Sequence, residues 1–417
     1  MDEYIEGVLP DESAYVPAEE PKPKPKPKQK APKVAQARKK WNFKLIRKEI
    51  DKPFFVLVLA LLVFGIVMMF SASYAQAIAE HGDGYHYVVK QIKSALLGIA
   101  AMAAISLLDY HFFQNTVIAH LSFIVTWLVC LATPYIGSTT ADATRWIDLG
   151  FVQVQPSELM KVTFIIVFAF IMAVNFPYFD NWKFSTAPFA FLFVMVAIVL
   201  VLQRHMSAVL LFGIIGLTMM FVSGMPKKHF FAFIGLVFLA GALLVLYKMF
   251  IDKDFGYITD RIQSWRDPLS DPTDKTLQTY NSLIAIGSGG VFGLGFGESR
   301  QKYLYLPESQ NDFVFSVVCE ELGLIGALVV ILLFVMFILR GFYIASRAKD
   351  RFGMLLATGI TVQIGAQALL NIAVASNAFP NTGISLPFFS YGGTALAIQL
   401  AEMGILLSIS RQANTDK

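Results

Sequence analysis

The sequence has little charge for its length. Asp, Glu, Lys and Arg make up 15% of the 417 residues, and 56% are hydrophobic. Soluble proteins carry about 25% charged residues, so this composition excludes a soluble globular protein. Apolar runs of about 20 residues recur, each long enough to cross a bilayer as a helix. The short alternating segments of a membrane barrel are missing. The sequence therefore predicts an all-α polytopic membrane protein.

Metal-ligand and nucleotide patterns are scarce as well. The two cysteines, Cys130 and Cys319, both lie in apolar runs, and no CxxC pair occurs. The six histidines are scattered without zinc-type spacing, so no metal site is predicted. The segment IGSGGVFGLGFGESRQK lacks the GK[ST] of a Walker loop. Its glycines are instead expected to allow tight turns and close packing.

The hydropathy pattern divides the chain into three parts. Residues 1–52 form a Pro/Lys-rich tail that cannot bury a core, so we expect it to be disordered. It would either contact anionic lipid headgroups or simply solubilise and orient the chain. Residues 53–410 form the membrane domain, and residues 411–417 form a short second tail. Ten spans are expected near residues 54–73, 88–108, 116–133, 159–175, 186–203, 206–224, 229–250, 313–340, 352–376 and 387–410.

Basic residues predict the orientation of these spans. Lys and Arg cluster in the N-terminal tail, in the loops near residues 227–228 and 340–351, and at Arg411, all on the same side. That side should be cytoplasmic, with both termini inside. The opposite, extracellular side then receives residues 137–161, 251–312 and 376–394, of which the second is a large loop between helices 7 and 8. Long structured loops are usually functional.

Acidic residues mark the end of the large loop, in YLPESQNDFVFSVVCEELG. Asp312 lies where helix 8 begins. It would either cap that helix or act as a general base for a hydroxyl. Glu320 follows eight residues later, roughly 12 Å deeper, beside Glu321. Acids at such depth face a protein interior or a polar cavity. They would serve as hydrogen-bond and ion-pair partners or as a proton relay.

Cations lie near the same membrane boundary. Arg145 and Lys161 lie in the first outer segment, and Arg300 and Lys302 precede Asp312. Such cations bind phosphate, either in lipid headgroups or in a diphosphate substrate. Within the first segment, Pro156 with its neighbours Ser157 and Glu158 is also ordinary helix-start sequence. From the residues alone, the chain is a membrane enzyme or carrier for a lipid phosphate.

Three motifs carry a family resemblance. TRWIDLG with QPSELMK, SLIAIGSGGVFGLGFGESRQKYLYLPESQNDFVFSVVCEELG, and NTGISLPFFSYGGT occur in this order over residues 53–410. They resemble the SEDS family of shape, elongation, division and sporulation proteins, and they are most similar to its division and sporulation branch. One departure lies at Gln203–Ser207, where a QPDxG-like stretch is frequent in the family and Arg204 and His205 stand here.

The resemblance implies an inverting peptidoglycan glycosyltransferase that polymerises lipid II outside the bacterial cytoplasmic membrane, at the division septum. Asp312 matches the essential loop aspartate and would deprotonate the acceptor GlcNAc 4-hydroxyl. The glycan on undecaprenyl diphosphate would be the donor. Trp146 matches the tryptophan of the family's RW motif. Further candidates for substrate binding are Arg145, Lys161 and Lys302 for the diphosphate, Glu308 and Gln310 for the pocket, and Ser390 and Tyr391 for the cavity wall.

The resemblance also implies partners. A class B penicillin-binding protein, which is a transpeptidase, and divisome proteins are expected, and nucleic acid is not. The sequence indicates no definite cofactor, and a diphosphate can recruit Mg²⁺ or Mn²⁺ without a protein cage. Two other functions stay open. A lipid II flippase or lipid-phosphate carrier would use membrane-embedded polar residues such as Gln363, Gln367 and Asn371. A division scaffold would tolerate loss of Asp312.

Overall fold

The computed structural model describes residues 48–136, 138–140, 143–148, 153–203, 206–247, 265–269 and 276–413. The chain separates into two units, Met1–Trp41 and Asn42–Lys417, and all described residues belong to the second. Most of the predicted tail and the Arg204–His205 pair lie outside the described residues.

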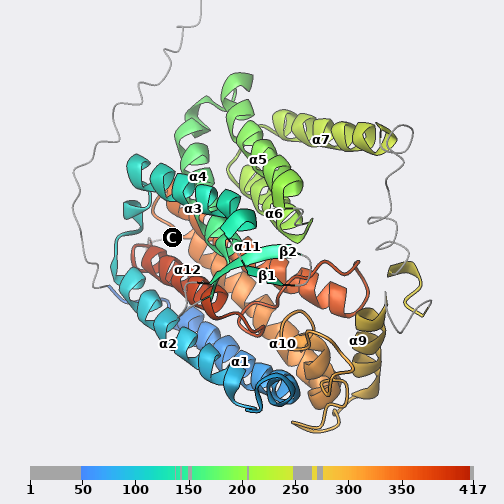
Figure 1. Ribbon diagram of the computed structural model, residues 1–417. Helices are drawn as coiled ribbons and strands as arrows, with labels where there is room; N and C mark the ends of the chain where they lie inside the picture. Colours follow the sequence, from blue (N-terminus) through green and yellow to red (C-terminus); the bar gives the residue numbers. More distant parts are fainter. Residues whose placement is uncertain are drawn as a thin grey trace, which may run out of the picture. The chain divides into compact units, whose positions relative to one another are not determined.

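Long helices occupy the ten ranges that the hydropathy pattern predicts (Figure 1). They are α1 (Lys52–His81), α2 (His86–Leu107), α3 (Thr116–Ile136), α4 (Pro156–Asn175), α5 (Trp182–Gln203), α6 (Met206–Val222), α7 (Lys227–Tyr247), α10 (Val314–Ser346), α11 (Arg351–Ala375) and α12 (Gly393–Arg411). Within the described residues, eight of these helices are long and apolar enough to cross a bilayer. The chain is therefore a polytopic helical membrane protein.

Shorter elements lie between the long helices. They are the 3-10 helices η3 (Tyr110–Phe112) and η4 (Phe176–Tyr178), the helix α9 (Leu277–Ser288), and the strands β1 (Ser138–Thr140), β2 (Ala143–Asp148) and β3 (Gln153–Val154). The strands form an antiparallel sheet in the order β1-β2-β3. This small sheet builds the first outer segment, for which the sequence predicts only a loop, and it leads directly into α4.

Polar residues fix where the helices begin. The Asp51 carboxylate accepts a hydrogen bond from the Phe54 amide, 2.9 Å away, and so caps α1. Arg340 of α10 donates to both oxygens of the same carboxylate, at 2.9 and 2.8 Å. This bidentate pair joins the start of α1 to the end of α10. The prediction that α4 starts at Pro156 with Glu158 in its first turn is confirmed.

A histidine joins two segments at this end of the bundle. His111 of η3 lies between two carboxylates, with Nδ1 2.6 Å from Asp109 and Nε2 2.5 Å from Asp350. Asp350 also caps α11 by accepting from the Gly353 amide at 2.7 Å. The hydrogen bond to Asp350, followed by that to Asp109, raises the pKa of His111 above its usual value. His111 therefore holds η3 against the start of α11.

The glycine-rich segment explains an interruption in α10. Gly323 has φ 65° and ψ −162°, which breaks the helix into two parts. Around the break, backbone bonds run to the glycine-rich segment instead of along the helix. They join Leu294 N to Glu320 O (2.9 Å), Gly295 N to Glu321 O (3.0 Å), Leu324 N to Gly290 O (2.9 Å) and Ile325 N to Val291 O (3.3 Å). The segment thereby satisfies the backbone groups that the break leaves open.

Glycine is needed here because the two backbones touch. A Cβ on Gly289 would lie 1.9 Å from the Cys319 carbonyl oxygen, and one on Gly293 would lie 2.1 Å from that of Glu321. Neither contact is sterically possible. The expected close packing of these glycines is thus observed, and it is packing of loop backbone on helix backbone.

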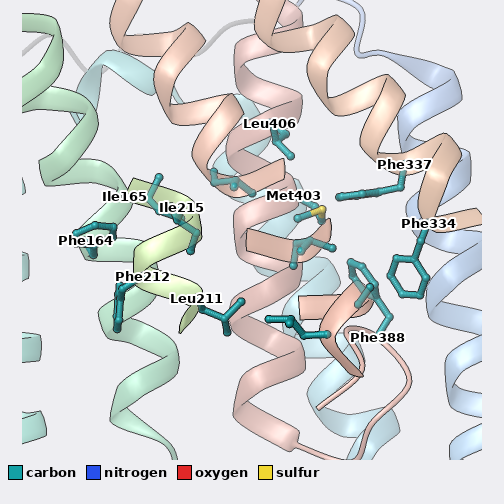
Figure 2. Packing of buried hydrophobic residues seen from close by; sticks show 14 of the residues in the cluster. Phe164, Ile165, Leu211, Phe212, Ile215, Phe334, Phe337, Phe388, Met403 and Leu406 are labelled. Carbon is teal, nitrogen blue, oxygen red and sulfur yellow. The ribbon is translucent and has the colours of Figure 1, made fainter. Parts of the chain in front are cut away.

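The helices bury a continuous apolar core. Figure 2 shows Phe164 and Ile165 of α4 facing Phe212 and Ile215 of α6, all of them buried. The core continues past Met403 and Leu406 of α12 to Phe334 and Phe337 of α10 and to Phe388, which precedes α12. α12 packs along α2, where a Cβ on Gly404 would lie 2.7 Å from the Met102 carbonyl oxygen. Small residues permit this close approach of helices.

Candidate active site

Asp312 lies one residue before the N-cap of α10. The N-cap position is Phe313, which makes no side-chain capping bond. Asp312 donates its amide to the Glu308 carbonyl oxygen at 3.2 Å, and its side chain is half-buried. The sequence left open whether this aspartate caps the helix. The structure places it in the turn that leads into α10, with its carboxylate at the edge of the bundle.

The Asp312 carboxylate lies against the backbone of Gly383. A Cβ on Gly383 would be 3.3 Å from Asp312 Oδ2, and Gly383 has φ +67°. Asn381 fixes this turn by accepting a hydrogen bond from the Gly383 amide at 3.2 Å. A side chain at residue 383 would therefore be strained and would also press on the carboxylate. The α11–α12 loop (residues 376–392) forms the wall beside Asp312.

Asn371 of α11 holds the two sides of this site together. Its side chain is 0% exposed. Its amide nitrogen donates to the Asp312 carbonyl oxygen at 2.7 Å and to the Ile384 carbonyl oxygen at 2.6 Å. One side chain thus ties the turn before α10 to the α11–α12 loop, next to Gly383. Loss of this amide would leave two buried carbonyl groups without a donor.

Gln310 and Ser390, which the resemblance suggests for the pocket and the cavity wall, lie near each other at this junction. Gln310 accepts from the Tyr391 amide through its carbonyl oxygen at 2.8 Å. The Ser390 hydroxyl donates to the Asn311 carbonyl oxygen and accepts from the Leu386 amide. Both side chains are buried. In this arrangement they shape the loops around Asp312, because the Ser390 hydroxyl is already occupied by the protein.

Glu308 and Tyr391 lie at the solvent side of the junction. Glu308 has an exposed side chain and φ +56°, and its carboxylate accepts from the Asn311 amide group at 2.5 Å. Partial burial raises the pKa of the Tyr391 phenol. Tyr391 is therefore a proton-bearing donor at neutral pH. Among the expected pocket residues, these two offer polar groups closest to solvent.

The Lys302 ammonium group is bound by other groups of the protein. Its ammonium donates to Glu321 Oε1 at 2.9 Å, the Ser71 hydroxyl at 3.1 Å and the Gly297 carbonyl oxygen at 2.6 Å. The two side chains of the ion pair are 3% and 0% exposed. An ammonium group has three protons, and each has an acceptor here. Lys302 thus forms a buried ion pair in this structure, and its expected contact with the diphosphate stays a prediction.

Glu320 likewise organises the chain before Asp312. Its carboxylate accepts from the Arg300 amide at 3.0 Å, the Gln301 amide at 3.3 Å and the Ser299 hydroxyl at 2.5 Å. Of the two roles open for Glu320 and Glu321, hydrogen-bond and ion-pair partners or a proton relay, the geometry favours the first. The two acids anchor residues 297–302 on the first part of α10.

Lys161 belongs to a second polar cluster, inside the bundle. Its ammonium lies 2.8 Å from Glu158 and 3.1 Å from Gln367 Oε1, and all three side chains are buried. Gln367 in turn donates to Ser385 of the α11–α12 loop at 3.1 Å. Lys161 is thus connected to the Asp312 site through Gln367 and that loop, and not through a direct contact.

Sequence reasoning missed Glu402 and the full role of α11. Glu402 of α12 is 0% exposed, and Gln363 donates to both of its oxygens at 2.9 and 3.1 Å. Gln363, Gln367 and Asn371 follow one another every four residues, so they share one face of α11. A lone acid in the apolar run AIQLAEMGILL was the available signal.

Arg145 and Trp146 lie in β2, where Trp146 pairs with Ser138 of β1. Their side chains, and the departure at Arg204 and His205, lie outside what the structure describes. Within the described residues, no three His, Cys, Asp or Glu side chains converge as metal ligands. The fold and site define a polytopic membrane protein with the Asp312 carboxylate at the junction of two loops.

A family model for cell cycle proteins of the FtsW, RodA and SpoVE type matches residues 52–415. The chain belongs to this family, as the resemblance predicted. It is 37% identical to the probable peptidoglycan glycosyltransferase FtsW of Geobacter sulfurreducens, covering 88% of this chain and 98% of the relative. It is 34% identical to stage V sporulation protein E of Bacillus subtilis, covering 85% and 95%.

Solved structures share the fold. One chain, from a study of polymerization and crosslinking by a peptidoglycan synthase complex, matches with TM-score 0.70 and 24% identity, covering 88% of this chain and 99% of that one. The rod shape determining protein RodA of Thermus thermophilus matches with TM-score 0.63 and 24% identity, covering 88% and 98%. The helical arrangement is therefore that of these solved structures.

Proposed function

We propose that this protein is a peptidoglycan glycosyltransferase that polymerises lipid II, with Asp312 as its general base. The observation that carries the proposal is the placement of the Asp312 carboxylate. Asp312 is half-buried and lies at the meeting point of two loops. Asn371 holds its backbone carbonyl, and its carboxylate lies against Gly383. Relatives at 33–37% identity named as probable peptidoglycan glycosyltransferases support the reaction class.

The proposed reaction forms one bond and breaks one. The acceptor GlcNAc 4-hydroxyl oxygen attacks the anomeric carbon of the donor sugar as its proton passes to the Asp312 carboxylate. The bond from that carbon to the diphosphate oxygen breaks, and undecaprenyl diphosphate leaves with the electron pair. Attack opposite the leaving group inverts the anomeric centre. General base catalysis of this kind contributes on the order of 10²–10⁴-fold.

Cations would stabilise the leaving diphosphate. Arg145 and the exposed Arg300 are the candidates that remain after Lys302 is assigned to its ion pair, and Lys161 would act from inside the bundle. Mg²⁺ or Mn²⁺ would bind together with the diphosphate if either takes part.

The membrane arrangement belongs to the same proposal. We place ten spans in the bacterial cytoplasmic membrane at the division septum, with both termini in the cytoplasm. The clusters of Lys and Arg support this orientation. Asp312 then lies on the outer side, where lipid II is polymerised. A class B penicillin-binding protein and divisome proteins would be the partners, and the likeness to a chain of a peptidoglycan synthase complex supports this assignment.

Glycan-strand synthesis tests the base. Purified wild type and Asp312→Asn would each be combined with the transpeptidase partner and lipid II, and the polymer resolved by length. Lys52→Met serves as control, because its ammonium forms an exposed pair with Glu49. We expect polymer from wild type and control but not from Asp312→Asn with the complex intact. Normal polymer from Asp312→Asn would remove this carboxylate from catalysis.

A lipid-phosphate carrier is the second candidate. The row of Gln363, Gln367 and Asn371 along α11, with Lys161 and Glu402 beside it, places buried polar groups along a membrane helix. Each of these groups has a protein partner, which favours a structural network. Translocation of labelled lipid II in liposomes without any polymerisation by the wild-type complex would favour the carrier.

A further inference from the structure

Large apolar side chains cover the loop that precedes Asp312. Phe292 is 81% exposed, and Leu304 and Tyr305 are 64% exposed each. The other members are Val291 (54%), Leu294 (39%), Phe296 (53%) and Tyr303 (55%). We call residues 291–305 the aromatic loop. A contiguous apolar surface of this kind on a protein marks contact with a partner or with a membrane.

One of these exposed side chains, that of Leu304, belongs to a residue with an unusual backbone conformation. Leu304 has φ +67°, a left-handed conformation that a branched apolar residue rarely adopts. Its side chain is 64% exposed, so most of it is not covered by the described protein. A strained residue persists where the surroundings require it. The arrangement favours an apolar environment outside the protein.

The aromatic loop continues the lipid-facing surface of α10. The bonds from Leu324 to Gly290 and from Ile325 to Val291 place the start of the loop beside the second part of α10. An exposed row runs down this part of the helix, formed by Leu324, Leu328, Leu332, Val335 and Leu339. Their spacing of three or four residues puts them on one face. The loop therefore extends an apolar stripe that begins in the bilayer.

The length of α10 indicates at which level of the membrane the aromatic loop lies. Near its other end, Tyr343 lies 4.3 Å from the Arg340 guanidinium and 4.8 Å from that of Arg347. An aromatic ring with basic neighbours is typical of a membrane interface. Gly323 and Tyr343 are 343 − 323 = 20 residues apart, roughly 30 Å along a helix. That is about the thickness of the hydrocarbon core, so the break at Gly323 lies at the opposite interface.

We infer that the aromatic loop is an interfacial anchor that binds the phospholipid surface. Phe292 and Phe296 enter the boundary between acyl chains and headgroups, where aromatic rings are favoured. The exposed Arg300 lies in the same loop and can reach lipid phosphates. The backbone hydrogen bonds between this loop and α10 thereby also position the Asp312 site relative to the membrane surface. Asp312 precedes Gly323 by 11 residues, so it lies beyond the break, on the side away from the second part of α10.

Spin labels can measure the depth of this loop. The full chain would be made with Cys130→Ala and Cys319→Ala, two buried positions, and one new cysteine at Phe292, Phe296 or Leu304. Leu328→Cys is the lipid control, and the exposed Asp83→Cys in the α1–α2 turn is the water control. Proteoliposomes of phosphatidylethanolamine and phosphatidylglycerol would be probed with oxygen, which partitions into lipid, and with a water-soluble nickel chelate.

We expect labels at the three loop positions to collide more with oxygen than with the chelate, as the label at Leu328 should. The label at Asp83 should show the reverse preference. The preference should persist when the transpeptidase partner is added. Two results would overturn the inference. One is chelate access at all three loop positions equal to that at Asp83. The other is chelate access without the partner and protection from both reagents with it, which would assign the loop to a protein interface. An unchanged thermal midpoint of each labelled chain shows that the fold is kept.

Discussion

Replacing Lys302 by methionine tests whether this residue serves the fold or the substrate. The Lys302–Glu321 pair is almost fully enclosed, and Ser71 and the Gly297 carbonyl complete its bonds. Removing one member of such a pair leaves the other charge buried and costs about 3–5 kcal/mol of folding free energy. We therefore expect Lys302→Met to lower the thermal midpoint in detergent by roughly 5 °C.

The double variant gives the sharper result. Lys302→Met with Glu321→Gln removes both charges, so its loss of stability should be clearly smaller than the sum of the two single losses. The coupling between the two sites should be about 1–3 kcal/mol. The exposed pair of Lys52 and Glu49, with side chains 73% and 84% exposed, is the matched control. Lys52→Met should change stability by at most about 1 kcal/mol.

Activity separates the two roles of Lys302. If Lys302 binds diphosphate, Lys302→Met loses polymerisation at an unchanged thermal midpoint, and adding Glu321→Gln does not restore polymerisation. If Lys302 forms the structural pair, Lys302→Met lowers the thermal midpoint. At a temperature where the variant is still folded, it continues to make glycan. Additive stability losses in the double variant would refute the ion-pair reasoning.

Three further changes follow from the geometry. Gly289→Ala should prevent stable folding because its Cβ meets a carbonyl oxygen at 1.9 Å, whereas Gly287→Ala, with nothing within 4 Å, should be tolerated; expression and detergent elution profiles compare them. Asn371→Ala should lower the polymerisation rate and stability, by about 1–3 kcal/mol for the latter, whereas normal values for both would show that its two bonds do not position the site. His111→Gln tests pH dependence: because the pKa of His111 is raised, chiefly by Asp350, its contribution is complete below about pH 6.5 and is lost as pH rises through the raised value. The difference in thermal midpoint between wild type and this variant should therefore shrink from about pH 6 to pH 9, and a gap that widens would contradict the assignment.

The helices could be predicted from the sequence because the bilayer makes the signal simple. A helix that crosses lipid needs about 20 apolar residues, and α11 and α12 lie where such runs predict them. The start of α4 was also predictable, since Pro156 and Glu158 obey local rules for helix ends. The break at Gly323 was not. It depends on backbone groups of residues 290–295 replacing those of the helix, and such long-range pairing leaves no local pattern.

The same distinction between local signals and long-range contacts applies to the candidate site. Asp312 stood out as a carboxylate at an apolar boundary, and that feature is local. Lys302 had the same local appearance as a phosphate-binding cation, yet its partner Glu321 lies 19 residues away and Ser71 lies on α1. Whether a lysine faces a ligand or a carboxylate is decided by packing, which charge and spacing do not reveal.

The two buried acids and the lysine before Asp312 have a common effect. Glu320 holds the amides of residues 300 and 301, and Glu321 holds Lys302, so the chain leading to Asp312 is tied to the first part of α10 at two points. On the far side, Asn371 ties the same aspartate to the α11–α12 loop. A carboxylate fixed from both sides keeps its position relative to α10 and α11. A catalytic base needs that rigidity, because proton transfer requires hydrogen-bond distance to a hydroxyl delivered from the membrane surface.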